Sequence, residues 1–189
     1  MASLDGLRVA ALTSDGFEEA VLTEPVRTLQ EAGARVEILA PHAGEIQGLQ
    51  EASAGRRLTV DRLLHAARPD DYDALLLPGG ALSADALRMR AEVQALVRDI
   101  HQAGKPIAAI CHAPWVLISA GLVPGRTLTS HFSVQDDVRN AGGTWVDRAT
   151  VEDGNWLTSR DLHDLETFLP ALVDFFSRAA HAVRRVASA

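Results

Sequence analysis

The hydrophobic pattern of this chain alternates between short apolar runs and segments with helical spacing. Residues 7–12 are apolar without helical spacing and end at the polar segment 13–16, which is typical of a buried strand followed by a turn. Apolar residues then recur at helical spacing over 22–33, and residues 35–40 return to strand character. The order strand, helix, strand predicts a right-handed parallel crossover.

The same alternation continues towards the end of the chain. Apolar runs at 73–77 and 107–110 predict two more central strands, and the amphipathic segment 93–103 between them predicts a helix. Helices that alternate with fully apolar strands predict an α/β fold, with a mostly parallel sheet covered by helices on both faces. The pattern also predicts a hairpin within 41–69, short strands at 127–129, 144–151 and 156–158, and helices at 60–67, 112–120, 134–140 and from 164 towards 178, the last kinked at Pro170.

Length and composition narrow the class of protein. The 189 residues suit a single domain spanning 1–189, with a short helical tail after about residue 178. A formal net charge of −7 argues against nucleic acid as a partner, because an acidic chain repels phosphate. Cys111 is the only cysteine, which excludes an intrachain disulfide. No apolar run approaches ~20 residues and the first residues lack a signal-peptide pattern, so we expect a cytoplasmic protein without a membrane partner.

Candidate chemistry gathers in four loops. In open α/β sheets, ligands bind outside the carboxyl ends of the parallel strands. The four loops that leave these ends carry a carboxylate, a double glycine, a thiol and an imidazole, namely Glu18, Gly79-Gly80, Cys111 and His131. If the sheet is parallel, these groups meet in one cleft.

Cys111 lies where the expected strand 107–110 turns into a helix beginning near His112, with Pro114 in the first helical turn. This is the setting of a nucleophile elbow, in which the side chain projects from a tight turn. A helix N-terminus also favours thiolate, so we expect the pKa of Cys111 to lie well below its ordinary value. The alternative is a buried structural cysteine. Gly79 and Gly80 either form only a tight turn or contribute to an oxyanion hole, because glycine lets backbone N–H groups approach a reacting oxygen.

Glu18 and the histidines each allow two interpretations. Glu18 either starts a helix as a solvated acid, or turns inward with a raised pKa and donates a hydrogen bond to the thiolate. His112 is a candidate base or a helix cap, and His163, after the expected strand 156–158, is a weaker candidate base. No Cys-x-x-Cys, His-Glu-x-x-His or Gly-x-Gly-x-x-Gly pattern occurs, so we expect neither a metal nor a cofactor.

Seven segments, in the same order along the chain, resemble the PfpI-like branch of the DJ-1/PfpI superfamily, the family also called peptidase C56. The resemblance extends from about residue 7 to residue 176. The segments are 15–19 (DGFEE), 78–80 (PGG), 109–114 (AICHAP), 140–142 (NAG), 145–147 (WVD), 153–155 (DGN) and 158–160 (TSR).

The resemblance implies a flavodoxin-like, three-layer α/β sandwich that assembles as a dimer or a larger homo-oligomer. It implies Cys111 as nucleophile, His112 as its base and Glu18 as the carboxylate that holds the thiolate. Asp85 from the partner subunit would complete the triad, although some members have glutamate there. Two further positions depart from the common pattern and would alter the pocket, His131 where many relatives have tyrosine and Trp115 where many have glutamine.

The resemblance leaves several functions open. Members of the family look like cysteine peptidases, glyoxalases or deglycases, chaperones and oxidation sensors. Our leading hypothesis is a cysteine-dependent stress-defence hydrolase that acts on a peptide or a small carbonyl compound. In this hypothesis Cys111 attacks a carbonyl group, and either His112 or His131 transfers the proton. The alternative is a non-catalytic sensor or chaperone in which Cys111 is oxidised to sulfinic acid. A glutamine amidotransferase is a third hypothesis, resting on the shared fold and on the imperfect pair His163-Asp164.

Overall fold

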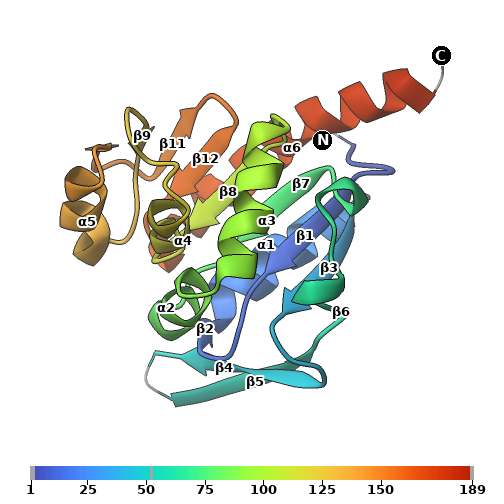
Figure 1. Cartoon of the computed structure of the whole chain (residues 1–189). Helices are drawn as coiled ribbons and strands as arrows, with labels where there is room; N and C mark the ends of the chain where they lie inside the picture. Colours follow the sequence, from blue (N-terminus) through green and yellow to red (C-terminus); the bar gives the residue numbers. More distant parts are fainter. Residues whose placement is uncertain (1–2, 52, 188–189) are drawn as a thin grey trace.

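A seven-stranded sheet forms the centre of the computed structural model, which describes residues 3–51 and 53–187. Its strands are β1 (Arg8–Leu12), β3 (Arg35–Ala40), β6 (Arg62–Leu63), β7 (Ala74–Leu77), β8 (Ile107–Ile110), β11 (Thr150–Asp153) and β12 (Trp156–Ser159). They lie in the order β11-β12-β8-β7-β1-β3-β6 (Figure 1). Only β11 runs antiparallel to its neighbour. The predicted crossover from β1 to β3 is confirmed as a parallel pair.

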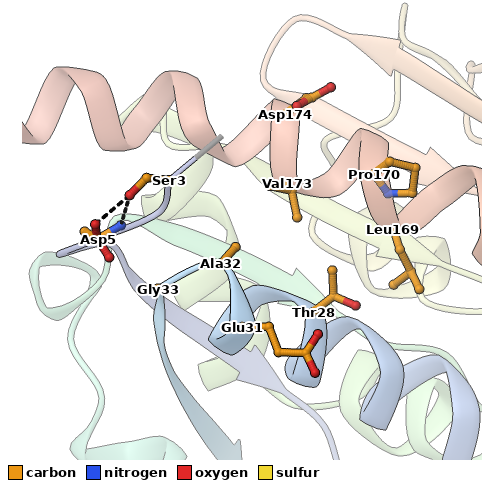
Figure 2. Close-up of a pocket in the computed structure, with 10 residues that line it drawn as sticks. All are labelled: Ser3, Asp5, Thr28, Glu31, Ala32, Gly33, Leu169, Pro170, Val173 and Asp174. Carbon is orange, nitrogen blue, oxygen red and sulfur yellow. Dashed lines mark hydrogen bonds between the residues drawn. The ribbon is translucent and has the colours of Figure 1, made fainter. Parts of the chain in front are cut away.

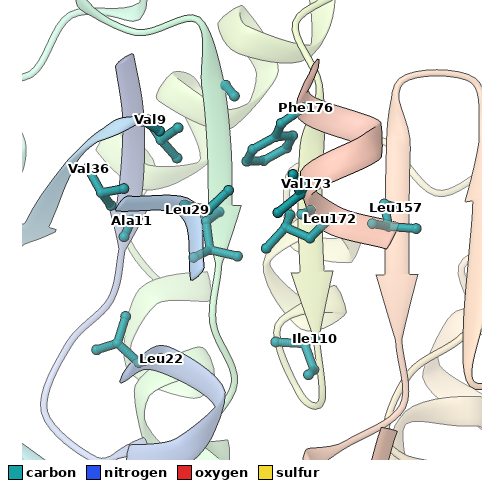
Figure 3. Packing of buried hydrophobic residues seen from close by; sticks show 14 of the residues in the cluster. Val9, Ala11, Leu22, Leu29, Val36, Ile110, Leu157, Leu172, Val173 and Phe176 are labelled. Carbon is teal, nitrogen blue, oxygen red and sulfur yellow. The ribbon is translucent and has the colours of Figure 1, made fainter. Parts of the chain in front are cut away.

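Helices cover both faces of this sheet. The first face packs on α1 (Glu19–Glu31) and α6 (Leu165–Ala187), and the second on α2 (Ala81–Arg88), α3 (Ala91–Gln102) and α4 (Pro114–Ser119). Strand β1 shows why its sequence does not alternate with polar residues. Val9 and Ala11 belong to the first apolar layer (Figure 3), and Ala10 and Leu12 belong to the second. The predicted three-layer α/β sandwich is therefore confirmed.

Two smaller sheets flank the central sheet. Strand β2 (Phe17–Glu18) pairs with β4 (Glu45–Gln50), which forms a hairpin with β5 (Ser53–Thr59), as expected for the middle of the chain. Strands β9 (Thr127–Leu128) and β10 (Thr144–Trp145) form a parallel pair, and α5 (Gln135–Asn140) lies between them in sequence. Short 3-10 turns occupy Leu64–Ala66, Pro69–Asp71, Phe132–Val134 and Leu162–Asp164.

Several expected elements differ from the structure. The helix predicted at 60–67 is wrong, because its first part pairs with β3 as β6 and only one 3-10 turn follows. The strand predicted at 144–151 is wrong as one element, since β10 and β11 belong to different sheets. Helix α2 was not anticipated. Helix α6 continues through Pro170 to Ala187, so the helical tail expected after about residue 178 belongs to the same helix.

Within residues 3–51 and 53–187, no helix is both long enough and apolar enough to cross a lipid bilayer.

Candidate active site

Cys111 occupies a strained turn at the carboxyl end of β8. Its φ of 64° is in the left-handed region, which only one other described non-glycine residue, Glu51, adopts. Its backbone is held on both sides, because its N–H donates to the Ser159 carbonyl at 3.2 Å and its carbonyl accepts from the His131 N–H at 2.9 Å. A left-handed cysteine between a strand and a helix is the geometry of a nucleophile elbow.

The double glycine closes over the thiol. A Cβ atom on Gly79 would overlap the Cβ atom of Cys111, and one on Gly80, whose φ is 108°, would overlap the backbone of residues 16–18. This close approach lets the Gly80 N–H donate to the Cys111 sulfur. Glycine at both positions is thus required sterically, and one backbone donor reaches the sulfur.

The pKa of Cys111 is shifted in the direction opposite to our expectation. The side chain is buried, with 8% of the residue exposed, and burial raises the pKa of the thiol to about 11. Hydrogen bonds from the Gly80 and His112 N–H groups oppose this rise without cancelling it. The prediction of a low pKa was wrong because α4 begins only at Pro114, so desolvation outweighs the helix N-terminus.

His112 has a hydrogen-bond partner on each ring nitrogen. Its Nδ1 lies 3.1 Å from the Cys111 sulfur, and its Nε2 lies 3.0 Å from the Ser133 Oγ. The ring stacks on His131, with centroids 4.4 Å apart. Burial, together with the neighbouring His131, lowers the pKa of His112 to about 4. The imidazole is therefore neutral at pH 7, with one ring nitrogen unprotonated.

The pKa of Glu18 agrees with the inward interpretation, but its hydrogen bonds do not. Burial raises the pKa of its carboxyl group, whereas a solvated acid at a helix start would show a lowered one. The carboxyl group accepts the backbone N–H of Glu51. The hydrogen bonds of the Cys111 sulfur run to His112 and Gly80 instead. Glu18 shares the cavity with the thiol without bonding to it.

A cavity of about 410 Å³ opens over the thiol. It brings together six of the predicted site residues, Glu18, Gly80, Cys111, His112, His131 and the weaker candidate His163. The other residues that line it are Gly16, Val21, Leu49, Glu51, Ala81, Leu82, Asp161 and Leu162.

The remaining predicted residues lie outside this cavity. Gly79 lies behind the thiol. Trp115 does not line the cavity; its ring packs on His112 at 5.1 Å and its Nε1 donates to Asp137 at 2.7 Å. Asp85 is exposed on α2 and does not line the cavity of its own chain.

Sequence reasoning missed several contributors. Asp161 and Leu162 lie just after β12, beside the candidate His163, and the rule about carboxyl ends applies to them as well. Ser133 lies in the same predicted loop as His131, but no sequence motif marks a serine at this position as functional. Glu51 follows the β4 strand of the hairpin, whose pairing with β2 was not predicted.

A larger cavity, of about 570 Å³, lies elsewhere, between the end of α1 and α6 (Figure 2). Its lining contains apolar groups and carboxylates, and neither a cysteine nor a histidine among the described residues. It therefore offers no nucleophile comparable to Cys111. Across the described part of the chain, no group of three or more His, Cys, Asp or Glu side chains is arranged to hold a metal ion.

Comparison with known proteins identifies the family of this chain. The model of the DJ-1/PfpI family matches residues 7–175. Deglycase PfpI of Pyrococcus furiosus is 38% identical over 167 residues, covering 88% of this chain and 98% of the relative. Protein/nucleic acid deglycase 2 of Escherichia coli is 38% identical over 162 residues, covering 85% and 92%.

Solved structures show the same fold. A cysteine-to-alanine mutant of the DJ-1 superfamily protein STM1931 from Salmonella typhimurium superposes with a TM-score of 0.81 at 29% identity, covering 96% of each chain. DJ-1 of Schizosaccharomyces pombe superposes with a TM-score of 0.79 at 21% identity, covering 93% of this chain and 98% of that one.

Proposed function

Because this chain belongs to the DJ-1/PfpI family, we propose that it is a cysteine-dependent hydrolase of the deglycase type, acting on small carbonyl adducts of amines. The observation that carries the proposal is the pair formed by Cys111 and His112, 3.1 Å apart at the base of a cavity. A thiol beside a neutral imidazole is the minimum arrangement for nucleophilic attack on a carbonyl carbon.

The two pKa shifts define how the first step would proceed. At pH 7 the sulfur carries its proton and His112 is neutral. His112 Nδ1 takes the thiol proton as the carbon–sulfur bond forms, and the carbonyl π pair moves onto oxygen. The Gly80 N–H, which points at the sulfur, is positioned to stabilise this oxygen. The proton on His112 then passes to the oxygen or, as the carbon–nitrogen bond breaks, to the departing amine. Water then breaks the carbon–sulfur bond, so that the carbonyl fragment leaves as an acid and the thiol regains its proton.

The size of the cavity favours a small substrate over a protein chain. About 410 Å³ is within the range of small-molecule sites. A peptidase must also hold an extended segment on both sides of the scissile bond, and this lining offers a compact pocket. Peptidase activity is therefore our second candidate. It is supported by the Bacillus subtilis relative YraA, 36% identical, whose name suggests a cysteine protease without asserting it.

The experiment that tests the proposal compares three substrates. Purified wild type and Cys111→Ser are incubated with methylglyoxal, with the methylglyoxal adduct of N-acetylarginine, and with a fluorogenic peptide. We expect wild type to release free N-acetylarginine and the serine variant to release none. Cleavage of the peptide alone would select the peptidase hypothesis. Turnover that persists in Cys111→Ser would overturn both.

The sensor alternative is less well supported. Peroxide oxidises the thiolate, so sensor cysteines combine a low pKa with exposure. Cys111 is buried and its thiol pKa is raised. These properties differ from those of a sensor cysteine.

We also propose that the protein acts as a homodimer through the surface of α2. Leu82 and Met89 are large apolar residues with 64% and 73% of their surface exposed, and they flank the exposed Asp85. A partner helix would cover them and bring a second Asp85 near the site. A carboxylate there would act on His112 through its charge, raising the pKa of the imidazole.

A further inference from the structure

The hydrogen bonds around His131 fix the direction of a chain of donors and acceptors. The backbone N–H of Ser133 donates to His131 Nδ1 at 3.3 Å, so this nitrogen carries no proton. The Ser133 hydroxyl lies 2.8 Å from the same nitrogen and must therefore be its donor. With its proton committed to His131, the Ser133 oxygen can only accept from the nitrogen of His112 that faces it.

This direction determines the tautomer of His112. The Ser133 Oγ lies 3.0 Å from His112 Nε2, so Nε2 carries the proton of the neutral ring. His112 Nδ1 is then unprotonated and faces the Cys111 sulfur at 3.1 Å. The opposite tautomer would direct an N–H at a protonated thiol and leave no base there. The ring also contacts the rings of His131 and Trp115, which limits its rotation.

We propose that Ser133, oriented by His131, is the positioning residue that keeps His112 protonated on Nε2 and basic on Nδ1. As a statement about catalysis this rests on the proposed function, but the tautomer can be tested without any substrate. Ser133 would fill the place on the base that a carboxylate fills in many triads.

The hydrogen bond between His112 and Ser133 can also persist when the proton moves from Cys111 to His112. When the Cys111 proton moves to Nδ1, the product is an imidazolium and a thiolate. Nε2 keeps its proton and still donates to Ser133, so no heavy atom has to move. Glu18, Glu51 and Asp161 also line the cavity, but the ring nitrogens of His112 bond to Cys111 and Ser133. A partner's Asp85 would therefore act at longer range, not as a hydrogen-bond acceptor of Nε2.

The test uses the full-length protein labelled with ¹⁵N histidine. In wild type at pH 7, we expect the His112 resonances to show a protonated Nε2 and an unprotonated Nδ1. Ser133→Ala should shift the ring towards the other tautomer, and Ser133→Thr, which keeps the hydroxyl, should restore it. Ser53→Ala, an exposed serine in the hairpin, is the matched control.

Kinetics supply the second readout. Ser133→Ala should lower kcat about tenfold or more with KM unchanged, a part of the ~10²–10⁴-fold that a general base contributes, and Ser133→Thr should recover most of it. If wild type turns over no substrate, the alkylation rate of Cys111 by iodoacetamide replaces kcat. A wild-type ring protonated on Nδ1 would overturn the proposal. An unchanged tautomer in Ser133→Ala, or a changed tautomer with unchanged kinetics, would also overturn it.

Discussion

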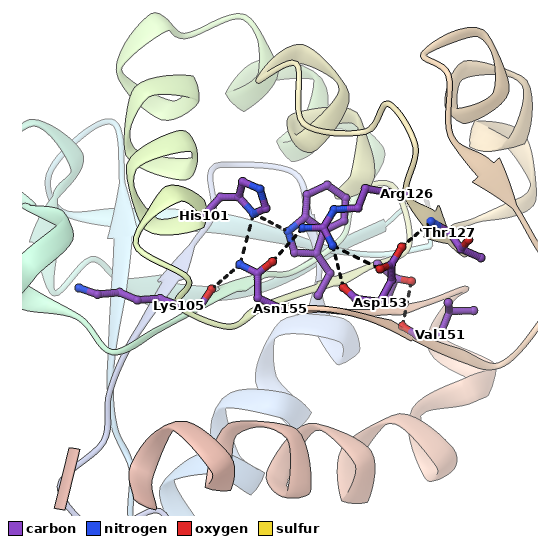
Figure 4. A network of polar contacts seen from close by, with 9 residues as sticks. His101, Lys105, Arg126, Thr127, Val151, Asp153 and Asn155 are labelled. Carbon is purple, nitrogen blue, oxygen red and sulfur yellow. Dashed lines mark hydrogen bonds and ion pairs between the residues drawn. The ribbon is translucent and has the colours of Figure 1, made fainter. Parts of the chain in front are cut away.

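The two ends of the same pair of strands, β8 and β12, have opposite characters. At their carboxyl end lie the strained Cys111, the overlapping glycines and a cavity. At their amino end lies a closed polar network (Figure 4), in which Asn155 connects His101, Lys105 and Arg126. Both ends are built on the same strands, so the difference comes from the loops.

The amino end satisfies its polar groups with one another. Asn155 accepts from Arg126 at 2.9 Å and donates to the Lys105 carbonyl at 2.9 Å. Arg126 also bonds to Asp153 and stacks over the Trp156 ring at 4.5 Å. Such a network stabilises the strands in one register. The amino ends of β8 and β12 therefore stabilise the sheet, whereas their carboxyl ends carry a strained, buried thiol.

The largest effect should come from Cys111 itself. Cys111→Ala and Cys111→Gly both remove the sulfur, and we expect each to reduce turnover by at least ~10³-fold. They should differ in stability, because glycine relieves the left-handed φ of 64° and should be more stable than alanine by ~1 kcal/mol. Urea denaturation measures the difference. Equal stability would mean that the turn is not strained.

Disrupting the polar network at the amino ends of β8 and β12 should lower stability and leave turnover nearly unchanged. Asn155→Ala leaves the Arg126 guanidinium and the Lys105 carbonyl without this partner, and should lower the free energy of unfolding by about 1–3 kcal/mol. Turnover by the folded enzyme should change by less than about twofold. Asn140→Ala, exposed at the end of α5, is the control. A parallel loss of turnover and stability would contradict the separation of the two ends.

The pH dependence of stability should report on His112. Its pKa is about 4 in the folded protein and ~6.5 in the unfolded chain. Between these values the unfolded state binds more protons, so stability falls as the pH drops from ~6.5 to ~4. The expected loss is about 1–2 kcal/mol, since the half-buried ring is partly screened by solvent. His112→Asn should remove it, and His65→Asn, on the surface, should not. An unchanged pH profile in His112→Asn would show that the ring titrates normally.

The smallest effect should come from Asp85. Asp85→Asn should lower turnover about two- to threefold, because a distant carboxylate in contact with solvent contributes ~0.5 kcal/mol.

Leu82→Ser combined with Met89→Ser should shift the protein from dimer to monomer in light scattering. A wild type that is monomeric at micromolar concentration would exclude a partner's contribution to this edge.

Much of the fold could be predicted because the central strands are buried on both faces. Residues 7–12, 73–77 and 107–110 are apolar at every central position, and each became a strand. The prediction was wrong for short segments whose secondary structure depends on pairing with a distant strand. Residues 62–63 form a strand only because β3 lies beside them, and no local signal distinguishes them from the start of a helix.

The candidate site could be located from the sequence, but its energetics could not. Ligands bind outside the carboxyl ends of parallel strands. This rule correctly predicted that Cys111, Gly80, Glu18 and His131 share one cavity. The sign of the Cys111 shift depends on burial, and burial depends on how loops from distant parts of the chain close over the thiol. Ser133 was missed for the same reason, since its hydrogen bonds exist only after the two histidines stack.

The packing of Gly80 against residues 16–18 has a consequence for how the protein forms. This contact joins segments that are far apart in sequence, and such non-local contacts are slow to close. Until they close, Cys111 is an ordinary cysteine with a pKa of ~8.5, open to oxidants and alkylating agents. Folding therefore acts as the thiol's protection. The time at which iodoacetamide alkylation of a newly made chain slows to the rate of the folded protein marks the moment when this part of the molecule is complete.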